Sequence, residues 1–444
     1  MILLAIISAL LTFYDPVFQK DLSIEFLNQK MLDIRNGSLT NILIHKPFLT
    51  ERPAIVFSPS VKFLGYHMDD RIFSNYVIDL KFKLGFKVSN FSTFAQVDFF
   101  NFNEPNKFPY WHPFSDVSYL LYSFDEQPIV GGKSILDINV KEAYAEYDND
   151  RYNLLVGRAN IRVGEGLLFS GNSYPLDYIY RAGIKLRNFK VISAFAVPVD
   201  TFQRRSISYQ VLEWTPHPNL VFTLYEAVSH SDEDVFKYFN PVSLYYERQR
   251  RGKSNNDNLL GGFCLRYLVR QRASLFFELL NDDIVVFQGG TSKYALNTGL
   301  EFLPDTTQIF RLSVVLIPRF TYTHVSDTNS WQIMGNPIGY PRGNDLIDFY
   351  LSYLKYIDKH RAFVARFAFL NKGEGTLIEK WEGSSYPRNV QYPSGNVRRD
   401  FLFMMGYKLK GFYLGTVADL VYRGNNHIFG FFLNFESDIF KLNF

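Results

Sequence analysis

The sequence predicts an antiparallel, all-β barrel that crosses a membrane with about sixteen to eighteen strands. Three observations carry this prediction: long stretches of alternating apolar and polar residues, many aromatic residues, and no long apolar run. The 444 residues include 44 Phe and 29 Tyr, yet the mean hydropathy is −0.09 and 20% of residues are charged. A helical membrane protein would instead contain apolar runs of about 20 residues.

The clearest alternation runs from Tyr76 to Val88. Its odd positions include Asp79, Lys81 and Lys83. Successive side chains of a strand point to opposite faces, so this strand has one apolar face and one charged face. The apolar face consists of Tyr76, Ile78, Leu80, Phe82, Leu84, Phe86 and Val88.

The same period recurs along most of the chain. A soluble β-sandwich or propeller would also alternate, but its strands are usually shorter and their exposed faces carry fewer aromatic residues. In lipid, a sheet must close on itself to satisfy every backbone polar group, which favours the barrel. The other alternating segments are 91–101, 135–147, 151–163, 182–197, 205–214, 218–228, 257–268, 273–281, 292–302, 308–318, 346–355, 360–370, 401–409, 411–422 and 427–444.

The connections between these segments are unequal in length. Residues 103–133, 229–256, 319–345 and 371–398 are long connections, whereas 423–426 is a tight turn. Outer-membrane barrels have short turns on the periplasmic side and long loops on the extracellular side.

The residues before the predicted barrel strands form two further parts of the chain. Residues 1–14 form a short apolar run that we interpret as a signal peptide, although no basic residue precedes it and no A-x-A site follows. Residues 15–53 contain helix-spaced apolar positions and predict a helical periplasmic segment or plug, with a disordered linker as the alternative. The barrel then comprises residues 54–444.

The C-terminal residues predict an assembly signal. Phe440, Leu442 and Phe444 share one face of a final strand, which resembles the terminal signal by which the barrel assembly machinery recognises its clients. The apolar face changes register around Glu436 and Ser437, which indicates a bulge.

Charge and motifs exclude several function classes. With 47 basic and 44 acidic residues, the chain lacks the basic excess of a nucleic-acid binder. The single cysteine, Cys264, excludes an internal disulfide and a Cys-rich metal site, so we expect neither a metal nor a cofactor. No catalytic motif is present, and we predict no enzyme; a barrel hydrolase with an unmarked carboxylate pair remains an alternative.

One basic cluster stands out, formed by Arg248, Arg250, Arg251 and Lys253. It is either a solvated loop or a contact for phosphates on surface lipids or an anionic polymer.

Aromatic and arginine residues gather in three of the predicted loops. Aromatic rings stack on sugars, and Arg pairs with acidic sugars or phosphates, so these residues are candidates for glycan binding. The alternative is loop packing and an interfacial aromatic belt. The candidates are Tyr110, Trp111, Trp331, Tyr340, Arg342, Trp381, Tyr386 and Arg388.

Three groups of short motifs resemble the family of outer-membrane barrels similar to the capsule assembly protein Wzi. In this sequence they are Tyr152–Arg158 with Ile161–Gly166 and Leu168–Asn172; Asn240-Pro241 with Asp257–Gly261 and Phe276–Asp282; and Gly335–Gly339 with Gly343–Asp345. The resemblance implies an eighteen-stranded barrel, a helical periplasmic plug and a lectin-like role at the cell surface.

The leading functional hypothesis is therefore a monomeric outer-membrane barrel that contacts outer-membrane lipids and retains exported polysaccharide. A porin for passive or solute-specific diffusion is the alternative. A porin needs a polar lumen, which Asp79, Lys81, Lys83 and Glu301 are candidates to line.

Overall fold

The structure is a computed structural model of the 444-residue chain. It describes residues 54–68, 71–103, 134–170, 176–198, 205–231, 238–239, 244–251, 257–269, 272–282, 293–305, 307–333, 336–340, 342–357, 361–381, 392–409, 412–422, 427–436 and 440–443. The predicted signal peptide and periplasmic segment, 1–14 and 15–53, lie outside the described residues.

The described residues form strands almost throughout. The wall strands are β1 (Ala54–Met68), β2 (Arg71–Val88), β3 (Phe91–Asn103), β4 (Ser134–Asp148), β5 (Tyr152–Ala159), β8 (Leu176–Leu186), β9 (Phe189–Pro198), β10 (Arg205–His217), β11 (Leu220–Ser231), β12 (Asn258–Val269), β13 (Ala273–Asp282), β14 (Lys293–Phe302), β15 (Gln308–Ile317), β18 (Leu346–Tyr356), β19 (Arg361–Lys372), β20 (Arg398–Leu409), β21 (Phe412–Tyr422), β22 (His427–Glu436) and β23 (Phe440–Asn443).

Six short elements lie in the connections between wall strands. They are β6 (Arg162–Val163), β7 (Phe169–Ser170), α5 (Tyr245–Arg251), η2 (Asp327–Asn329), β16 (Gln332–Ile333) and β17 (Asn336–Pro337). Among the described residues, no helix has the length and hydropathy needed to cross a membrane.

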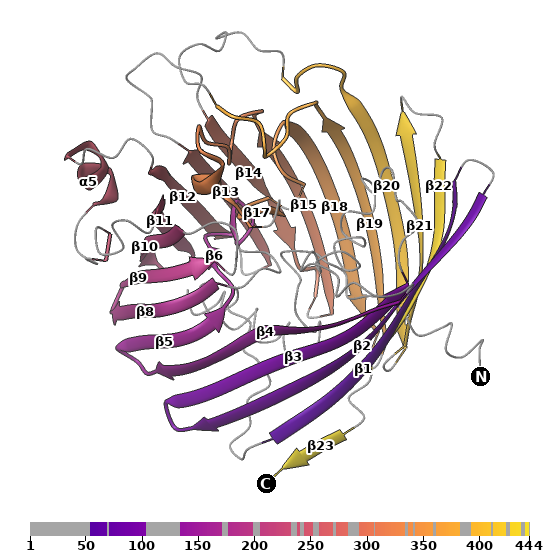
Figure 1. The fold of residues 1–444 in the computed structure, drawn as a ribbon, viewed down its shortest axis with the longest axis horizontal. Helices are drawn as coiled ribbons and strands as arrows, with labels where there is room; N and C mark the ends of the chain where they lie inside the picture. The colour runs from indigo at the N-terminus through magenta and orange to yellow at the C-terminus, as the bar shows by residue number, and fades with distance from the viewer. Residues whose placement is uncertain are drawn as a thin grey trace.

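Each wall strand from β1 to β21 pairs antiparallel with the next wall strand along the chain (Figure 1). β1 pairs with β2 on one side and with β22 and β23 on the other, so the series of pairings returns to its first strand. Within the described residues, the 19 strands of this sheet occupy eighteen positions, because β22 and β23 pair with successive parts of β1. The predicted all-β antiparallel barrel is confirmed.

The register between β1 and its C-terminal partners shifts by one residue. Ser60 is opposite Glu436, whereas Phe57 is opposite Phe440. A one-residue change of register between these pairs agrees with the bulge that the sequence predicts around Glu436 and Ser437.

The strands alternate between a buried and an exposed face, as the sequence predicts. Along β13, Ser274, Phe276 and Glu278 are buried, whereas Leu275 is 49% exposed. Along β2, Phe82 and Leu84 are 40% and 47% exposed. Apolar side chains on the outer face belong next to hydrocarbon, so the chain is an outer-membrane protein whose outer surface contacts lipid.

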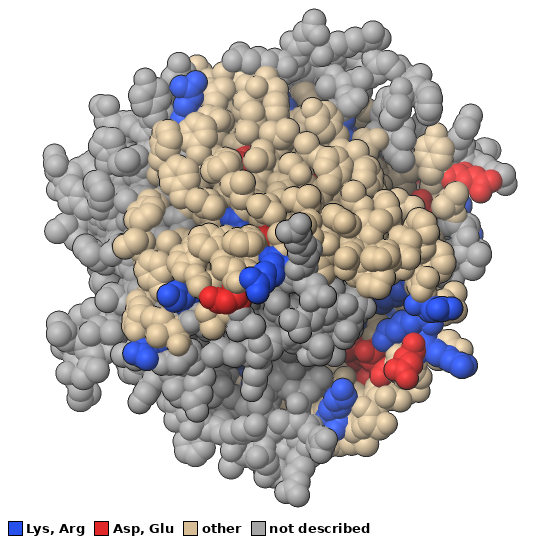
Figure 2. Space-filling model, turned by 180° about the vertical axis from the view of Figure 1, so that it is seen from behind, with Lys and Arg blue, Asp and Glu red and all other residues tan. Residues whose placement is uncertain are grey.

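The outer surface is correspondingly poor in charge. In Figure 2, much of the described surface is tan, and the Lys, Arg, Asp and Glu side chains gather in small groups near its borders.

The two ends of the sheet differ. The turns at 89–90, 187–188 and 218–219 lie at the same end as the paired residues Ala54 and Asn443. The connections 160–175, 232–257 and 318–345 lie at the opposite end and are much longer. The short-turn end is the periplasmic end by the usual architecture of these proteins.

Candidate channel constriction

Two of the long connections fold into the interior of the sheet instead of extending away from it. The connection from β5 to β8 contains the β6–β7 hairpin, and the connection from β15 to β18 contains η2, β16 and β17. We call these the hairpin segment (residues 160–170) and the second segment (residues 318–345). Figure 1 draws β6 and β17 inside the curve of the wall strands.

An aromatic cluster joins the hairpin segment to the wall and to the second segment. Phe169 lies 6.0 Å from Tyr209, 5.8 Å from Tyr225 and 5.6 Å from Trp331 between ring centroids. The hydroxyl of Tyr322 also donates to the carbonyl oxygen of Leu168 at 2.8 Å. Edge-on and offset ring pairs of this kind add to the stability gained from apolar burial, so the two segments pack as one unit.

Polar contacts hold the second segment against the wall. Arg205 of β10 donates to the carbonyl oxygen of Thr328 at 3.1 Å, and to those of Ser330 and Gln332. Asn258 of β12 donates to Asn329 O at 2.9 Å. These donors satisfy carbonyl groups that burial would otherwise leave without partners, which is why a non-regular segment is stable inside the barrel.

The tip of the hairpin segment presents a carboxylate to the wall. Glu165 stands between Gly164 and Gly166, whose φ angles are +62° and +71°. Glycine adopts this left-handed conformation without steric cost, so the chain can turn sharply at the tip. Arg266 of β12 donates to Glu165 through Nε at 2.9 Å and through Nη2. These two glycines therefore form a turn that lies inside the barrel.

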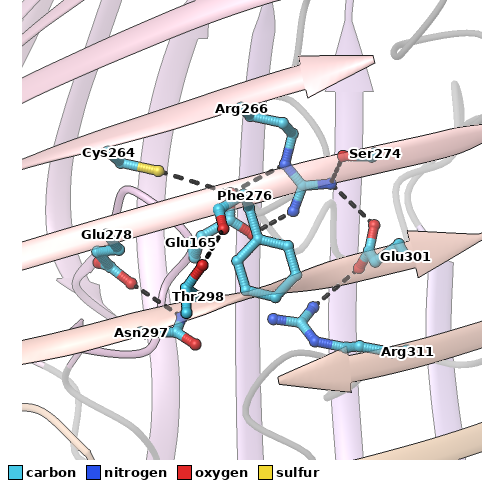
Figure 3. Close-up of polar contacts among 10 residues, drawn as sticks. All are labelled: Glu165, Cys264, Arg266, Ser274, Phe276, Glu278, Asn297, Thr298, Glu301 and Arg311. Carbon is cyan, nitrogen blue, oxygen red and sulfur yellow. Dashed lines mark hydrogen bonds and ion pairs between the residues drawn. The ribbon is translucent and has the colours of Figure 1, made fainter. Parts of the chain in front are cut away.

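The ion pair continues along the inner wall as a chain of alternating charges (Figure 3). Arg266 Nη1 lies 2.8 Å from Glu301 Oε2, and Arg311 Nη1 lies 2.8 Å from Glu301 Oε1. Phe276 lies between the two arginines, with ring centroid distances of 5.5 Å to Arg266 and 4.6 Å to Arg311. The side chains of Glu165, Arg266, Glu301 and Arg311 are all buried. Each charge therefore depends on its partners to offset the cost of dehydration.

A further carboxylate, Glu278, lies on the same inner face. It is fully buried and accepts a hydrogen bond from Asn297 at 3.3 Å. A Cβ added to Gly164 would lie 2.9 Å from its Oε1 atom and 3.3 Å from the Cβ of Cys264. The hairpin tip is therefore in close contact with β12 and β13.

Closer to the long-loop end, the second segment makes further polar contacts with the wall. Lys293 Nζ donates to the carbonyl oxygen of Thr323 at 2.7 Å, and it also lies 3.2 Å from Asp282 and 4.7 Å from the ring centroid of Trp381. Arg342 Nη1 lies 2.6 Å from Asp348, which also accepts from the Tyr340 hydroxyl. These contacts fix the second segment along β13, β14 and β18.

The structure places the glycan-binding candidates in different surroundings from those expected. Trp331 is fully buried, Tyr340 is 8% exposed, and Arg342 is engaged by Asp348. Trp381 is half-buried beside Lys293. The structure brings these residues into the interior packing and does not present Trp331 or Tyr340 as a stacking surface. Tyr110, Trp111, Tyr386 and Arg388 lie outside the described residues.

The structure describes the side chains of two of the four lumen candidates. Glu301 lies on the inner face in the charge chain, and Lys83 lies on the face of β2 opposite to the exposed Phe82 and Leu84. Asp79 and Lys81 belong to β2, but their side chains lie outside the description. Of the assembly signal, Phe440 and Leu442 are in β23, opposite Phe57 and Ile55, and Phe444 lies outside the described residues.

Sequence reasoning missed Glu165, Arg266 and Arg311. A signal exists for the two arginines, because each is a lone charge within an otherwise apolar or neutral strand, in Phe263–Val269 and Ile309–Ile317. Such a residue usually faces a polar interior. Within the described ranges, no three His, Cys, Asp or Glu side chains are grouped so as to hold a metal ion.

Neither a model of a known protein family nor a curated protein sequence matches this chain. Among solved structures, the chain is similar to Pseudomonas aeruginosa OccK7 (OpdD), with a TM-score of 0.48, 9% identity, and 88% and 99% coverage of the two chains. For Acinetobacter baumannii OccAB4 the TM-score is 0.47 and the identity 11%, with 90% of this chain and 100% of that chain covered. For the Pseudomonas aeruginosa outer membrane protein OprD the TM-score is 0.42 and the identity 10%, with 89% of this chain and 95% of that chain covered.

These findings correct the expected family and function. The expectation of a barrel similar to the capsule assembly protein Wzi, which retains polysaccharide, was wrong, since the similar solved structures are of the Occ and OprD type. The motif matches were misleading for a physical reason. Turns at glycine and short Asn-containing loops recur wherever strands of a barrel meet, so such motifs mark the architecture and do not identify a ligand.

Proposed function

We propose that this protein is an outer-membrane porin, with a solute path narrowed by the hairpin segment and the second segment. One observation supports this most strongly. The inner face of β12 to β15 carries Arg266, Glu301 and Arg311, which form a chain of ion pairs with Glu165 of the hairpin segment, whereas the outer face is apolar. A polar interior with inward-folded loops is the arrangement by which barrels form restricted channels.

The charges of this chain predict how the channel treats ions. Glu165, Arg266, Glu301 and Arg311 alternate in sign, and each arginine lies beside a carboxylate. Their fields cancel within a few ångströms, so this part of the path attracts neither anions nor cations strongly. We therefore propose a channel with weak ion selectivity that sorts solutes mainly by size.

A liposome swelling assay tests the proposal directly. The refolded full-length protein is reconstituted, and the vesicles are diluted into isotonic solutions of neutral sugars of increasing size. We expect swelling with a pentose that declines steeply for a trisaccharide, against a control of vesicles without protein. Absence of swelling with every sugar, from protein that migrates as a folded heat-modifiable band on a gel, would overturn the proposal.

The same proposal includes the route of assembly. β23 completes the pairing of β1 through Phe440 and Leu442, and a barrel cannot exist in lipid until these last pairs form. We propose that this strand is the part of the chain that the assembly machinery binds. A variant with Phe440→Ser should insert poorly in cells, and normal insertion of that variant would contradict this assignment.

A further inference from the structure

A third long connection behaves differently from the two inward-folded segments. The residues between β11 and β12 that the structure describes, 238–239 and 244–251, pack on the outer face of the wall. Tyr238 and Tyr245 form a buried cluster with Val228 of β11 and Leu259 of β12. Val228 shares its face of β11 with Leu224, which is 53% exposed on the outside. Figure 1 accordingly shows α5 outside the curve of the strands.

Hydrogen bonds fasten this segment to the wall. The backbone N–H of Tyr245 donates to Glu226 Oε1 at 3.0 Å, and Glu226 lies on the same outer face as Leu224. The hydroxyl of Tyr238 donates to Asp257 Oδ2 at 2.8 Å, and Gln249 Nε2 donates to the carbonyl oxygen of Asp257 at 2.8 Å. α5 is therefore held against the outer wall near the long-loop rim of the barrel.

The segment carries exposed apolar side chains and a run of arginines. Leu244 is 63% exposed and Tyr246 is 40% exposed. The sequence of the last turn of α5 contains Arg248, Arg250 and Arg251. Aromatic and aliphatic side chains beside arginines are typical of segments that lie in a membrane interface, where rings enter the acyl boundary and cations meet headgroups.

We propose that the α5 segment is a docking surface for the phosphorylated headgroups of outer-leaflet lipids. The position of α5 indicates the partner, because a helix packed on the outer wall at the rim has lipid headgroups as its neighbours. The arginines indicate the group that is bound, because guanidinium groups bind phosphate through paired N–H donors. Leu244 and Tyr246 would anchor the same segment among the acyl chains. The inference does not depend on whether the barrel conducts.

The probe is bis-phosphorylated lipid A, added to the detergent-solubilised full-length protein, with bound lipid counted by native mass spectrometry. The variant R248Q/R250Q/R251Q removes three charges while keeping good helix formers. The matched control, R151Q/R187Q/R272Q, removes three exposed arginines from turns at the opposite end. We expect the first variant to weaken lipid A binding about 150-fold, at roughly 1 kcal/mol for each of the three cations, and the control to retain it.

Two further measurements decide what a change means. Both variants must retain the circular dichroism and heat-modifiable migration of the folded barrel, and lipid A lacking its phosphates should bind the unaltered protein as weakly as the α5 variant does. Equal binding of lipid A by both triple variants would overturn the proposal. A dimer that the α5 variant converts to monomer would also overturn it, since the surface would then serve a second copy of the chain.

Discussion

Glu165, at the tip of the hairpin segment, forms a buried ion pair with Arg266 of the barrel wall. The two residues are 101 positions apart in sequence, so the pair joins two parts of the chain that local structure does not bring together. Arg266 also pairs with Glu301, which in turn pairs with Arg311. The contact thus links the hairpin segment to a network of charges that extends across the wall from β12 to β15.

Breaking this pair should be costly because a charge would remain buried without its partner. We expect Glu165→Gln to lower the free energy of unfolding by about 3 kcal/mol, in the range for a buried pair that loses one member. Denaturant titration in detergent, followed by tryptophan fluorescence, measures the change. The double variant with Arg266→Gln should lose less than the sum of the two single variants. Additive losses would contradict direct coupling.

The hairpin tip should tolerate no side chain at Gly164. Its φ of +62° disfavours any L-residue, and a new Cβ would lie 2.9 Å from Glu278 Oε1. We expect Gly164→Ala to lower the unfolding free energy by about 1–2 kcal/mol. Gly183→Ala in β8 is the matched control, because its nearest contact would be an ordinary 3.4 Å. Equal effects of the two changes on the denaturation midpoint would be inconsistent with a strained tip.

Two tryptophans should report opposite sides of the wall. Trp214 is 41% exposed on the outer face of β10 and stacks on Phe189 and Phe222, whereas Trp331 is fully buried inside. Variants that keep a single tryptophan are reconstituted into vesicles of brominated phospholipid. We expect strong quenching of Trp214 and little quenching of Trp331. Comparable quenching of both would show that the second segment does not occupy the interior.

The lone thiol should be protected by the hairpin segment. Cys264 is 4% exposed on the inner face, and its Sγ atom lies 3.6 Å from Glu165 Oε1. A hydrophilic maleimide should therefore leave the folded protein unlabelled over a time that labels the denatured chain completely. Gel-shift or mass measurement gives the answer, and rapid labelling of the folded protein would mean that the hairpin does not cover β12.

The wall of the barrel was predictable because lipid imposes a simple rule on each strand. Alternation alone located sixteen strand segments. The described sheet has eighteen strand positions, and two differences account for the change. The segment 182–197 contains a turn at Arg187 and Asn188 and is two strands, β8 and β9. The sequence of β1 contains Pro59 and Gly65 and lacks clear alternation, so it was not predicted as a strand. Its position in the sheet is set by pairing with β2 and β22.

The interior was not predictable by the same rule. Trp331 and Tyr340 have the composition of a surface loop that binds sugars, yet both are buried. Whether a loop folds inward depends on distant partners such as Arg205 and Asn258, which satisfy its carbonyl groups. No local pattern records those contacts. The outward course of α5 likewise depends on Glu226, a polar residue on a face that is otherwise apolar.

Single-channel conductance in a planar bilayer tests the central claim most directly. The full-length protein is compared with a variant in which a short Gly-Ser linker replaces residues 161–170, after both are shown to be folded barrels. We predict discrete conductance steps for the unaltered protein, a reversal potential near zero in a salt gradient, and several-fold larger steps for the variant. Silence from both proteins, or identical steps from the two, would contradict a porin narrowed by its hairpin segment.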